Sequence, residues 1–177
     1  MKKLIERLKD KFDIRGYKKQ KNNLYFIEVG SQKAVSLITY LRNIEDYTHL
    51  SLISAVDWEE KGKFQLTYIL YNSLQKHSLA IKILIDRSKP TMESIHHLWH
   101  QAATYQRELY EMFGIEFMGS PGLKDDFILE DWQEKPPMRR DFKTKEYSEQ
   151  TYFPRPGRKT HDPEKYMQKK LYPEGDK

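Results

Sequence analysis

The stretch FQLTYILYNSLQKHSLAIKILI, residues 64–85, predicts two β-strands joined by a polar turn. Apolar side chains occupy alternate positions in both halves: Phe64, Leu66, Tyr68 and Leu70, then Leu79, Ile81, Ile83 and Ile85. This alternation places them on one face of a sheet. Because the turn NSLQK is too short for a crossover connection, the two strands are predicted to be antiparallel.

Two further stretches extend this sheet. Residues 50–58 (LSLISAVDW) precede the first strand across the turn EEKGK, so three consecutive strands are predicted to form an antiparallel meander. Residues 24–29 (LYFIEV) are rich in aromatic and β-branched side chains and are followed by Gly30, which predicts a fourth strand. The basic stretch RGYKKQKNN before them is interpreted as a connection.

Helical periodicity marks three more segments. Apolar spacing predicts a short amphipathic helix over residues 2–13 and a second helix behind an N-cap at Ser31. After Pro90, apolar residues recur every three or four positions as far as Gly114, which predicts one long helix or two abutting ones, ended by a left-handed glycine. The fold class is therefore α+β, with helices packed on one mixed, largely antiparallel sheet over residues 1–119.

The pattern changes after residue 119. Prolines recur and favour extended backbone. Disordered tails are usually poor in aromatic residues, yet this segment holds Phe127, Trp132, Phe142, Tyr147, Tyr152, Phe153, Tyr166 and Tyr172. These rings have no core of their own, so residues 120–177 are predicted to form an extended arm that wraps a partner. A loose tail, or one folded back on its own domain, is the alternative.

The composition excludes several classes of function. The 177 residues include no cysteine, so disulfides, thiolate nucleophiles and cysteine ligands for zinc or iron–sulfur clusters are excluded. The apolar runs are strand-sized, far shorter than the roughly 20 residues of a membrane-spanning helix. The charged N-terminus MKKLIERLKDKF predicts no secretory signal and hence a cytoplasmic chain. A net charge of +5 is compatible with an anionic partner.

Catalytic and metal sites are weakly indicated. On a helix, ESIHHLWHQ would place Glu93, His96 and His100 on one face, as a metal site requires, but two histidines at this spacing arise easily by chance. A catalytic carboxylate needs a pocket that shifts its pKa, and no pattern here supplies one. Arg107 and Glu111 stand four residues apart, so a structural ion pair on a helix is favoured over catalysis.

Nucleotide and nucleic-acid binding have only weak signals in the sequence. Neither GxGxxG nor GxxxxGK[ST] occurs, so a nucleotide cofactor held by a standard glycine loop is not expected. The basic runs GYKKQK and PRPGRKTH, with nearby tyrosines, leave a basic nucleic-acid-binding module as an alternative function. Binding with a steep salt dependence would distinguish that alternative. Otherwise these runs are solvated loops and no nucleic-acid partner is expected.

Residues 136–142, PPMRRDF, form a sharper motif. Two prolines favour an extended approach, after which Arg139 and Arg140 precede Asp141 and Phe142. Planar guanidinium groups suit paired contacts with carboxylates, and the ring offers a surface to bury. The motif is therefore predicted to contact a partner, with an exposed basic turn as the alternative.

Four motifs in order, RELYEMFGIEF, GSPGL, ILEDW and PPMRRDF, resemble the 30 kDa subunit of respiratory complex I (NADH-quinone oxidoreductase) and its relatives in membrane-bound nickel–iron hydrogenases. The matching residues are Arg107, Glu108, Tyr110, Met112, Phe113, Gly114, Ile115, Phe117, Gly119, Pro121, Leu123, Asp131, Trp132, Pro137, Arg139, Arg140, Asp141 and Phe142. The departures are Gln106, Glu111, Ser120 and Met138, together with Asp125 and Asp126, which stand where the family commonly has a basic pair.

The resemblance implies a non-catalytic structural subunit in the peripheral arm of an ion-translocating, complex I-like enzyme. The chain itself would carry no cofactor or metal, whereas FMN, iron–sulfur clusters and quinone would belong to partner subunits. Its implied partners are the large hydrogenase-like subunit, the iron–sulfur subunit with the terminal cluster, near the quinone site, and other peripheral-arm subunits. It would be held peripherally, through the complex, on the cytoplasmic side of the inner membrane.

The same role in a membrane-bound hydrogenase or a ferredoxin-dependent relative is the alternative, since other subunits set the electron donor and acceptor. Residues predicted to contact partners are Arg107, Glu108, Tyr110, Glu111, Asp131, Trp132, Pro137, Arg139, Arg140, Asp141, Phe142, Tyr152 and Phe153. Residues predicted to be structural are Phe113, Gly114, Ile115, Phe117, Gly119 and Pro121.

Overall fold

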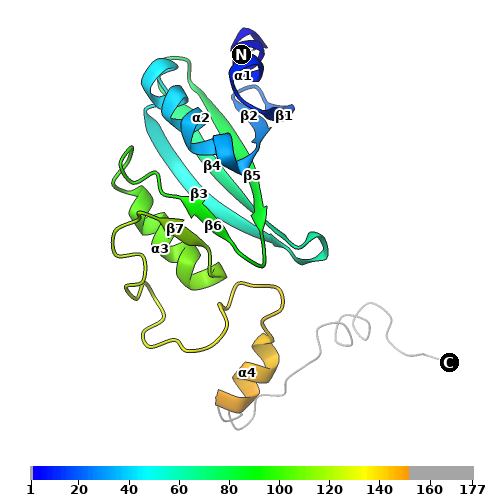
Figure 1. The fold of residues 1–177 in the computed structure, drawn as a ribbon, viewed down its shortest axis with the longest axis vertical. Helices are drawn as coiled ribbons and strands as arrows, with labels where there is room; N and C mark the ends of the chain where they lie inside the picture. Colours follow the sequence, from blue (N-terminus) through cyan, green and yellow to red (C-terminus); the bar gives the residue numbers. More distant parts are fainter. Residues whose placement is uncertain (1, 152–177) are drawn as a thin grey trace, which may run out of the picture. The chain divides into compact units, whose positions relative to one another are not determined.

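The computed structural model describes residues 2–151 (Figure 1), so the predictions for Tyr152, Phe153 and the rest of the arm lie outside the described residues. The chain divides between Phe142 and Lys143 into two compact units. The first unit continues past Gly119, where the change of composition placed the boundary. Helix α4 (Thr144–Thr151) belongs to the second unit, and Lys143 pairs with Glu146 in its first turn at 3.0 Å.

The first unit is built on a five-stranded sheet. Its strands, in spatial order, are β1 (Ile14–Lys21), β2 (Leu24–Val29), β5 (His77–Asp86), β4 (Lys63–Asn72) and β3 (His49–Trp58). All neighbours are antiparallel except β2 and β5, which are parallel. The predicted meander of β3, β4 and β5 is confirmed, and so is the α+β fold with a mixed, largely antiparallel sheet.

Strand β1 corrects the interpretation of RGYKKQKNN as a connection. Most of that stretch pairs with β2 along the outer edge of the sheet. Its second half is exposed on both faces, so no apolar alternation marks it as a strand. Lysines on an edge strand discourage pairing with another chain, which accounts for a basic sequence in this place.

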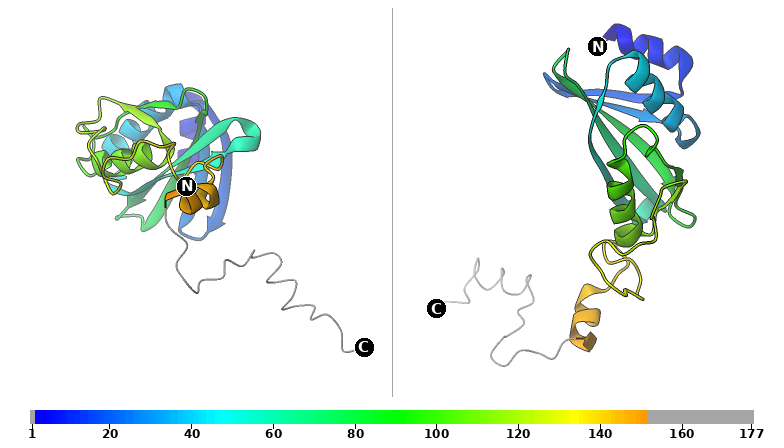
Figure 2. Two further views of the ribbon diagram at one scale, coloured as in Figure 1. Left: turned by 90° about the horizontal axis from the view of Figure 1, so that it is seen from below. Right: turned by 90° about the vertical axis from the view of Figure 1, so that its left-hand side faces the viewer.

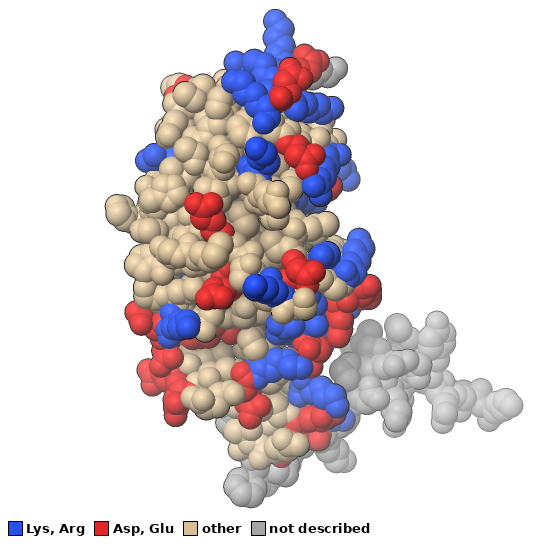
Figure 3. Space-filling view, viewed as in Figure 1, with Lys and Arg blue, Asp and Glu red and all other residues tan. Residues whose placement is uncertain are grey.

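Three helices pack against the sheet. Helices α1 (Lys2–Lys11), α2 (Ser31–Ile44) and α3 (Ala102–Phe113) bury their apolar side chains in one cluster with the inward-facing residues of the strands. Figure 2 shows α2 and α3 on the same side of the sheet. Figure 3 shows lysine and arginine side chains gathered over α1, at the end of the molecule near the N-terminus. Gly30, rather than Ser31, caps α2, and no side-chain hydrogen bond closes that cap.

The predicted long helix after Pro90 is wrong over its first half. Strand β6 (Thr91–Glu93) pairs in parallel with β7 (Glu116–Met118), and residues 94–101 form turns before α3 begins. Side chains of these turns and of α3 bond to the free edge of β3 and to the residue before it. Trp99 Nε1 donates to the Thr48 carbonyl at 2.7 Å, and Tyr105 Oη donates to the Ser51 carbonyl at 3.2 Å.

This change removes the metal geometry that helical spacing suggested. Glu93 ends a strand and His96 and His100 lie in the turns, so the three share no helix face. Among residues 2–151, no group of three or more His, Asp or Glu side chains is arranged to hold a metal ion. In the same range, no helix is both long and apolar enough to span a membrane.

Two buried tyrosines offer a test of the core. The Tyr68 hydroxyl is buried without a hydrogen-bond partner among the described residues, whereas the Tyr47 hydroxyl lies 2.6 Å from His77 Nε2. We expect Tyr68→Phe to leave the free energy of unfolding unchanged or to raise it, and Tyr47→Phe to lower it by about 1 kcal/mol. Urea unfolding of both variants checks this, and equal losses would contradict it.

Candidate functional site

The four sequence motifs meet where α3 ends and residues 120–142 return across the domain. These residues, called the strap here, contain little regular secondary structure. Side chains of α3 and of β3, β4 and β5 fasten them at several points. The contacts extend along the strap from Leu123, whose side chain is buried, to Phe142.

The first of these contacts is made by Glu111 of α3. Its carboxylate accepts three successive backbone N–H groups of the strap, from Phe127 at 2.7 Å, Ile128 at 3.0 Å and Leu129 at 3.2 Å. Successive N–H groups that converge in this way form a nest for an anion. Glu111 therefore bonds to the strap and not to Arg107, with which the helical spacing had paired it. Arg107 instead places its guanidinium 5.4 Å from the Phe127 ring centroid.

The end of α3 is shaped to receive the strap. Gly114 has φ 73°, a left-handed conformation that ends the helix as predicted. A Cβ at this position would also lie 3.3 Å from Pro136 Cγ, so both the backbone conformation and the packing favour glycine. Beyond it, the Met138 N–H donates to the Met112 carbonyl at 3.0 Å, and Arg139 Nη1 reaches the Phe113 carbonyl at 3.5 Å.

A charged network holds the last part of the strap. Asp57 is the last inward-facing residue of β3, and its side chain is 2% exposed. Arg87, after β5, donates to both Asp57 oxygens at 2.8 and 3.0 Å. The same guanidinium donates to Asp141 at 2.7 Å, and the Arg140 N–H donates to Asp57 at 2.9 Å. The network thus joins two strand ends to the strap.

The environment keeps these carboxylates ionised. Burial alone would raise the pKa of Asp57, but hydrogen bonds from Arg87 and the Arg140 N–H outweigh it and hold that pKa below its ordinary value. For Asp141, burial is likewise outweighed by hydrogen bonds from Lys135 and Arg87, so its pKa is also lowered. Arg87 has a raised pKa, chiefly through its hydrogen bond to Asp57.

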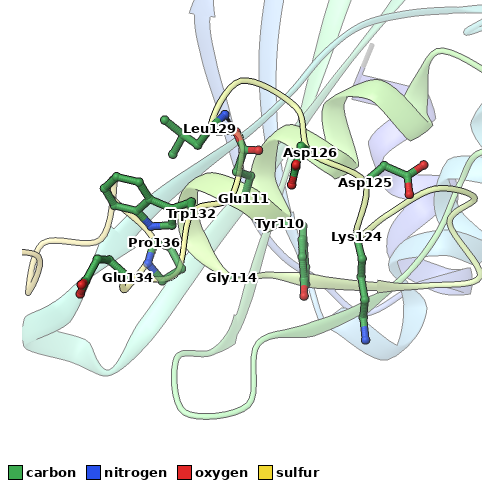
Figure 4. A pocket seen from close by; sticks show the side chains of 10 residues that line it. All are labelled: Tyr110, Glu111, Gly114, Lys124, Asp125, Asp126, Leu129, Trp132, Glu134 and Pro136. Carbon is green, nitrogen blue, oxygen red and sulfur yellow. Dashed lines mark hydrogen bonds between the residues drawn. The ribbon is translucent and has the colours of Figure 1, made fainter.

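A pocket of about 400 Å³ lies between α3 and the strap (Figure 4). Its lining residues are Tyr110, Glu111, Gly114, Lys124, Asp125, Asp126, Leu129, Trp132, Glu134 and Pro136. Figure 4 shows Glu111 directed at the backbone of Leu129, so this carboxylate closes the strap instead of facing a ligand. The acidic pair that departs from the family pattern, Asp125 and Asp126, lines the pocket.

The structure brings most of the predicted residues together. Arg107, Glu108, Tyr110 and Glu111 lie half-buried on α3, the strap residues Trp132, Pro137, Arg139, Asp141 and Phe142 are also half-buried, and Arg140 and Asp131 are exposed. The rings of Trp132 and Phe142 lie 5.8 Å apart. Of the predicted structural residues, Phe113, Ile115 and Phe117 are buried, Gly119 has φ 80°, and Pro121 is exposed.

Two residues of the network were missed from sequence. Asp57 interrupts the inward-facing apolar positions of β3, opposite Phe64, and a carboxylate in that register was a usable signal. Arg87 directly follows a strand and carried no comparable signal. The guanidinium groups of Arg87 and Arg139 also lie over the Phe64 ring, at 5.8 and 5.3 Å from its centroid. Phe64 therefore contributes cation–π contacts to the network.

These contacts define a packing module, an α+β domain whose charged motif residues fix the course of its own strap. The chain belongs to the family of the respiratory-chain NADH dehydrogenase 30 kDa subunit, whose model matches residues 27–148. The matched range includes α3 and the whole strap, where the four motifs lie.

Individual relatives agree with this assignment. A NADH-quinone oxidoreductase subunit of Cereibacter sphaeroides is 32% identical over 146 residues, which cover 80% of this chain and 72% of the relative. The corresponding subunit of Novosphingobium aromaticivorans is 32% identical over 125 residues, 70% of this chain but 40% of the relative's own length. A subunit of the F(420)H(2) dehydrogenase of Methanosarcina mazei is 29% identical over 64% of this chain and 72% of the relative.

Solved structures share the fold. A chain of the membrane-bound sulfane sulfur reductase, an archaeal respiratory membrane complex, superposes with a TM-score of 0.77 at 22% identity, covering 91% of this chain and 96% of that one. A trypsin-resistant fragment of Nqo5 superposes with a TM-score of 0.59 at 16% identity. The superposition covers 68% of this chain and 96% of the fragment.

The nest at Glu111 can be tested directly. Hydrogen bonds to a charged acceptor contribute roughly 1.5–3 kcal/mol each. We therefore expect Glu111→Ala to increase trypsin cleavage at Lys124 and Lys135 by at least about tenfold, while the remainder of the domain stays folded. Glu108→Ala, on the same helix, is the control and should cleave like the parent. Unchanged cleavage of Glu111→Ala would show that the nest does not hold the strap.

The charged network predicts a pH dependence. Because the folded-state pKa values of Asp57 and Asp141 lie below their unfolded values, both residues stabilise the fold above about pH 4 and lose this contribution as the pH falls through the folded values. We expect the free energy of unfolding, measured by urea titration, to decrease below about pH 4. Asp141→Asn should flatten this decrease, and an unaltered slope would contradict the assignment.

Proposed function

We propose that this chain is a non-catalytic structural subunit in the peripheral arm of a complex I-like membrane oxidoreductase. In this role it supports the large hydrogenase-like subunit and the iron–sulfur subunit that bears the terminal cluster, near the quinone site. FMN, iron–sulfur clusters and quinone would belong to partner subunits of the complex. The chain is held on the cytoplasmic side of the membrane through the complex.

One observation carries this proposal. Hydrogen bonds and ion pairs hold the strap on the domain, yet the strap exposes large apolar side chains. Ile128 is 64% exposed and Met138 is 58% exposed, and both stand next to residues whose backbone N–H groups or side chains bond to the domain. Apolar side chains held outward on a fixed backbone lose little entropy on binding, which is a property of interface anchors. The strap is therefore suited to present a preformed surface to another subunit.

The names of similar proteins support a role independent of the redox partners. They include a NADH-quinone oxidoreductase, an F(420)H(2) dehydrogenase and a sulfane sulfur reductase complex. Electron donor and acceptor differ among these, whereas the α+β domain is common to them. A subunit that supplies packing and no electron-transfer step accommodates such changes. The same role in a hydrogenase or ferredoxin-dependent relative follows from the same reasoning.

The strap surface can be tested by charge insertion. We expect Ile128→Glu combined with Met138→Glu to leave the unfolding midpoint of the isolated chain nearly unchanged, because both side chains are exposed. The same double variant should reduce co-purification of the large subunit by at least about tenfold, since buried apolar anchors typically contribute about 2 kcal/mol or more. Leu74→Glu, at a position 76% exposed in the β4–β5 turn, is the control. Full assembly of the double variant would refute the role of the strap.

A further inference from the structure

The second face of the five-stranded sheet, which the helices do not cover, has a pattern that neither the strap nor the core requires. This open face consists of the outward-pointing residues of β2, β3, β4 and β5. We propose that it binds an amphipathic protein segment that carries a carboxylate, contributed by another subunit. The proposal rests on the proposed function, because it takes the partner to be a member of the same complex.

Strand register places apolar side chains in rows across this face. In the first row, Leu52, Ile69, Ala80 and Phe26 stand opposite one another on four successive strands. In the second row, Val56 and Leu84 flank Gln65. Leu52, Val56 and Leu84 are 39%, 42% and 53% exposed. An antiparallel sheet that faces water usually carries polar residues at such positions, so the rows indicate a covered surface.

A polar row with a positive charge lies between the two apolar rows. Ser54, Thr67, Lys82 and Glu28 stand opposite one another along it. The Lys82 ammonium lies 4.8 Å from the Phe26 ring centroid, and the Lys61 ammonium lies 4.9 Å from that of Trp58. In residues 2–151 neither lysine forms an ion pair with a carboxylate, although Arg15 is paired with Asp13 at 2.6 Å.

These lysines border a hollow of about 210 Å³. Its lining residues are Arg15, Glu28, Val29, Trp58, Lys61, Gln65, Lys82 and Leu84. Because Arg15 is already paired with Asp13, Lys61 and Lys82 against Glu28 give the hollow its positive balance, and Trp58, Val29 and Leu84 give it apolar and aromatic walls. A carboxylate that entered it would meet the ammonium groups of Lys61 and Lys82, which form no ion pair among the described residues and can donate charge-assisted hydrogen bonds.

Charge complementarity selects the occupant. A second copy of this chain, related by a two-fold axis, would bring two such faces together, with Lys61 and Lys82 of each copy and only Glu28 of each to neutralise them, so a positive excess would remain. A partner segment with apolar side chains on both sides of an acidic one would match the rows. Successive rows are two residues apart along the strands, which is roughly 7 Å. That spacing suits side chains from consecutive turns of one helix or from alternate positions of one strand.

Site-specific crosslinking in the assembled complex tests the proposal. A photoreactive benzoylphenylalanine replaces Leu84 in the full-length chain, and, as a matched control, Ile44, which is 62% exposed at the end of α2. We expect the probe at position 84 to crosslink one peptide of another subunit that contains Asp or Glu, at a yield at least about tenfold above the control. Adducts with lipid, with a second copy, or with the chain itself would overturn the proposal.

A charge exchange separates contact from recognition. Lys82→Glu should lower the crosslinking yield from position 84 by about tenfold, as expected for the loss of one buried charge-assisted contact. Replacement of the crosslinked partner's carboxylate by lysine should restore it. An unchanged yield with Lys82→Glu would contradict the role of the lysine. If the strap variants assembled normally while position 84 still crosslinked a subunit, the proposed function of the strap would fail and the open-face inference would stand.

Discussion

The position of the strap depends on one buried carboxylate. Asp57 occupies an inward-facing place in β3, where a strand otherwise contributes apolar side chains. An ionised group there needs a charged partner, and removal of one partner from a buried pair costs about 3–5 kcal/mol. Arg87 supplies that partner, and its remaining N–H donors require a second acceptor, which is Asp141. The end of the strap is thus determined by the electrostatic needs of the sheet.

The other end of the strap is determined by a helix. The last turn of α3 leaves backbone carbonyls unpaired, and the strap satisfies two of them through the Met138 N–H and the Arg139 side chain. In return, Glu111 satisfies strap N–H groups that no strand or helix would pair. Each segment therefore completes hydrogen bonds that the other leaves open. This mutual dependence explains why the motif residues gather at a helix end.

The sequence-based predictions were correct where the spacing of apolar residues follows directly from the packing of a strand or helix. The alternation of apolar and polar residues predicted β4 and β5, and Gly114 predicted the end of α3, because both features follow from local backbone geometry. The predictions failed where long-range contacts decide. Residues 94–101 have helical spacing, but Trp99 is held by a carbonyl of residue 48, and no local pattern contains that bond. The strap contacts are of the same kind: the motifs located the residues, but their partners are distant in sequence.

The distribution of polar contacts separates two kinds of surface on the domain. Around the strap, Asp57, Arg87 and Asp141 are paired within the chain, and the exposed apolar side chains of Ile128 and Met138 stand on a backbone held by hydrogen bonds. At the open face, Lys61 and Lys82 lie over aromatic rings and form no ion pair among the described residues, so a carboxylate of a partner can pair with them. Binding at the first surface would depend chiefly on apolar burial, and binding at the second on charge as well. In the proposed role, two neighbours bound at these surfaces by different forces would be held in a defined order, because neither partner satisfies the surface meant for the other.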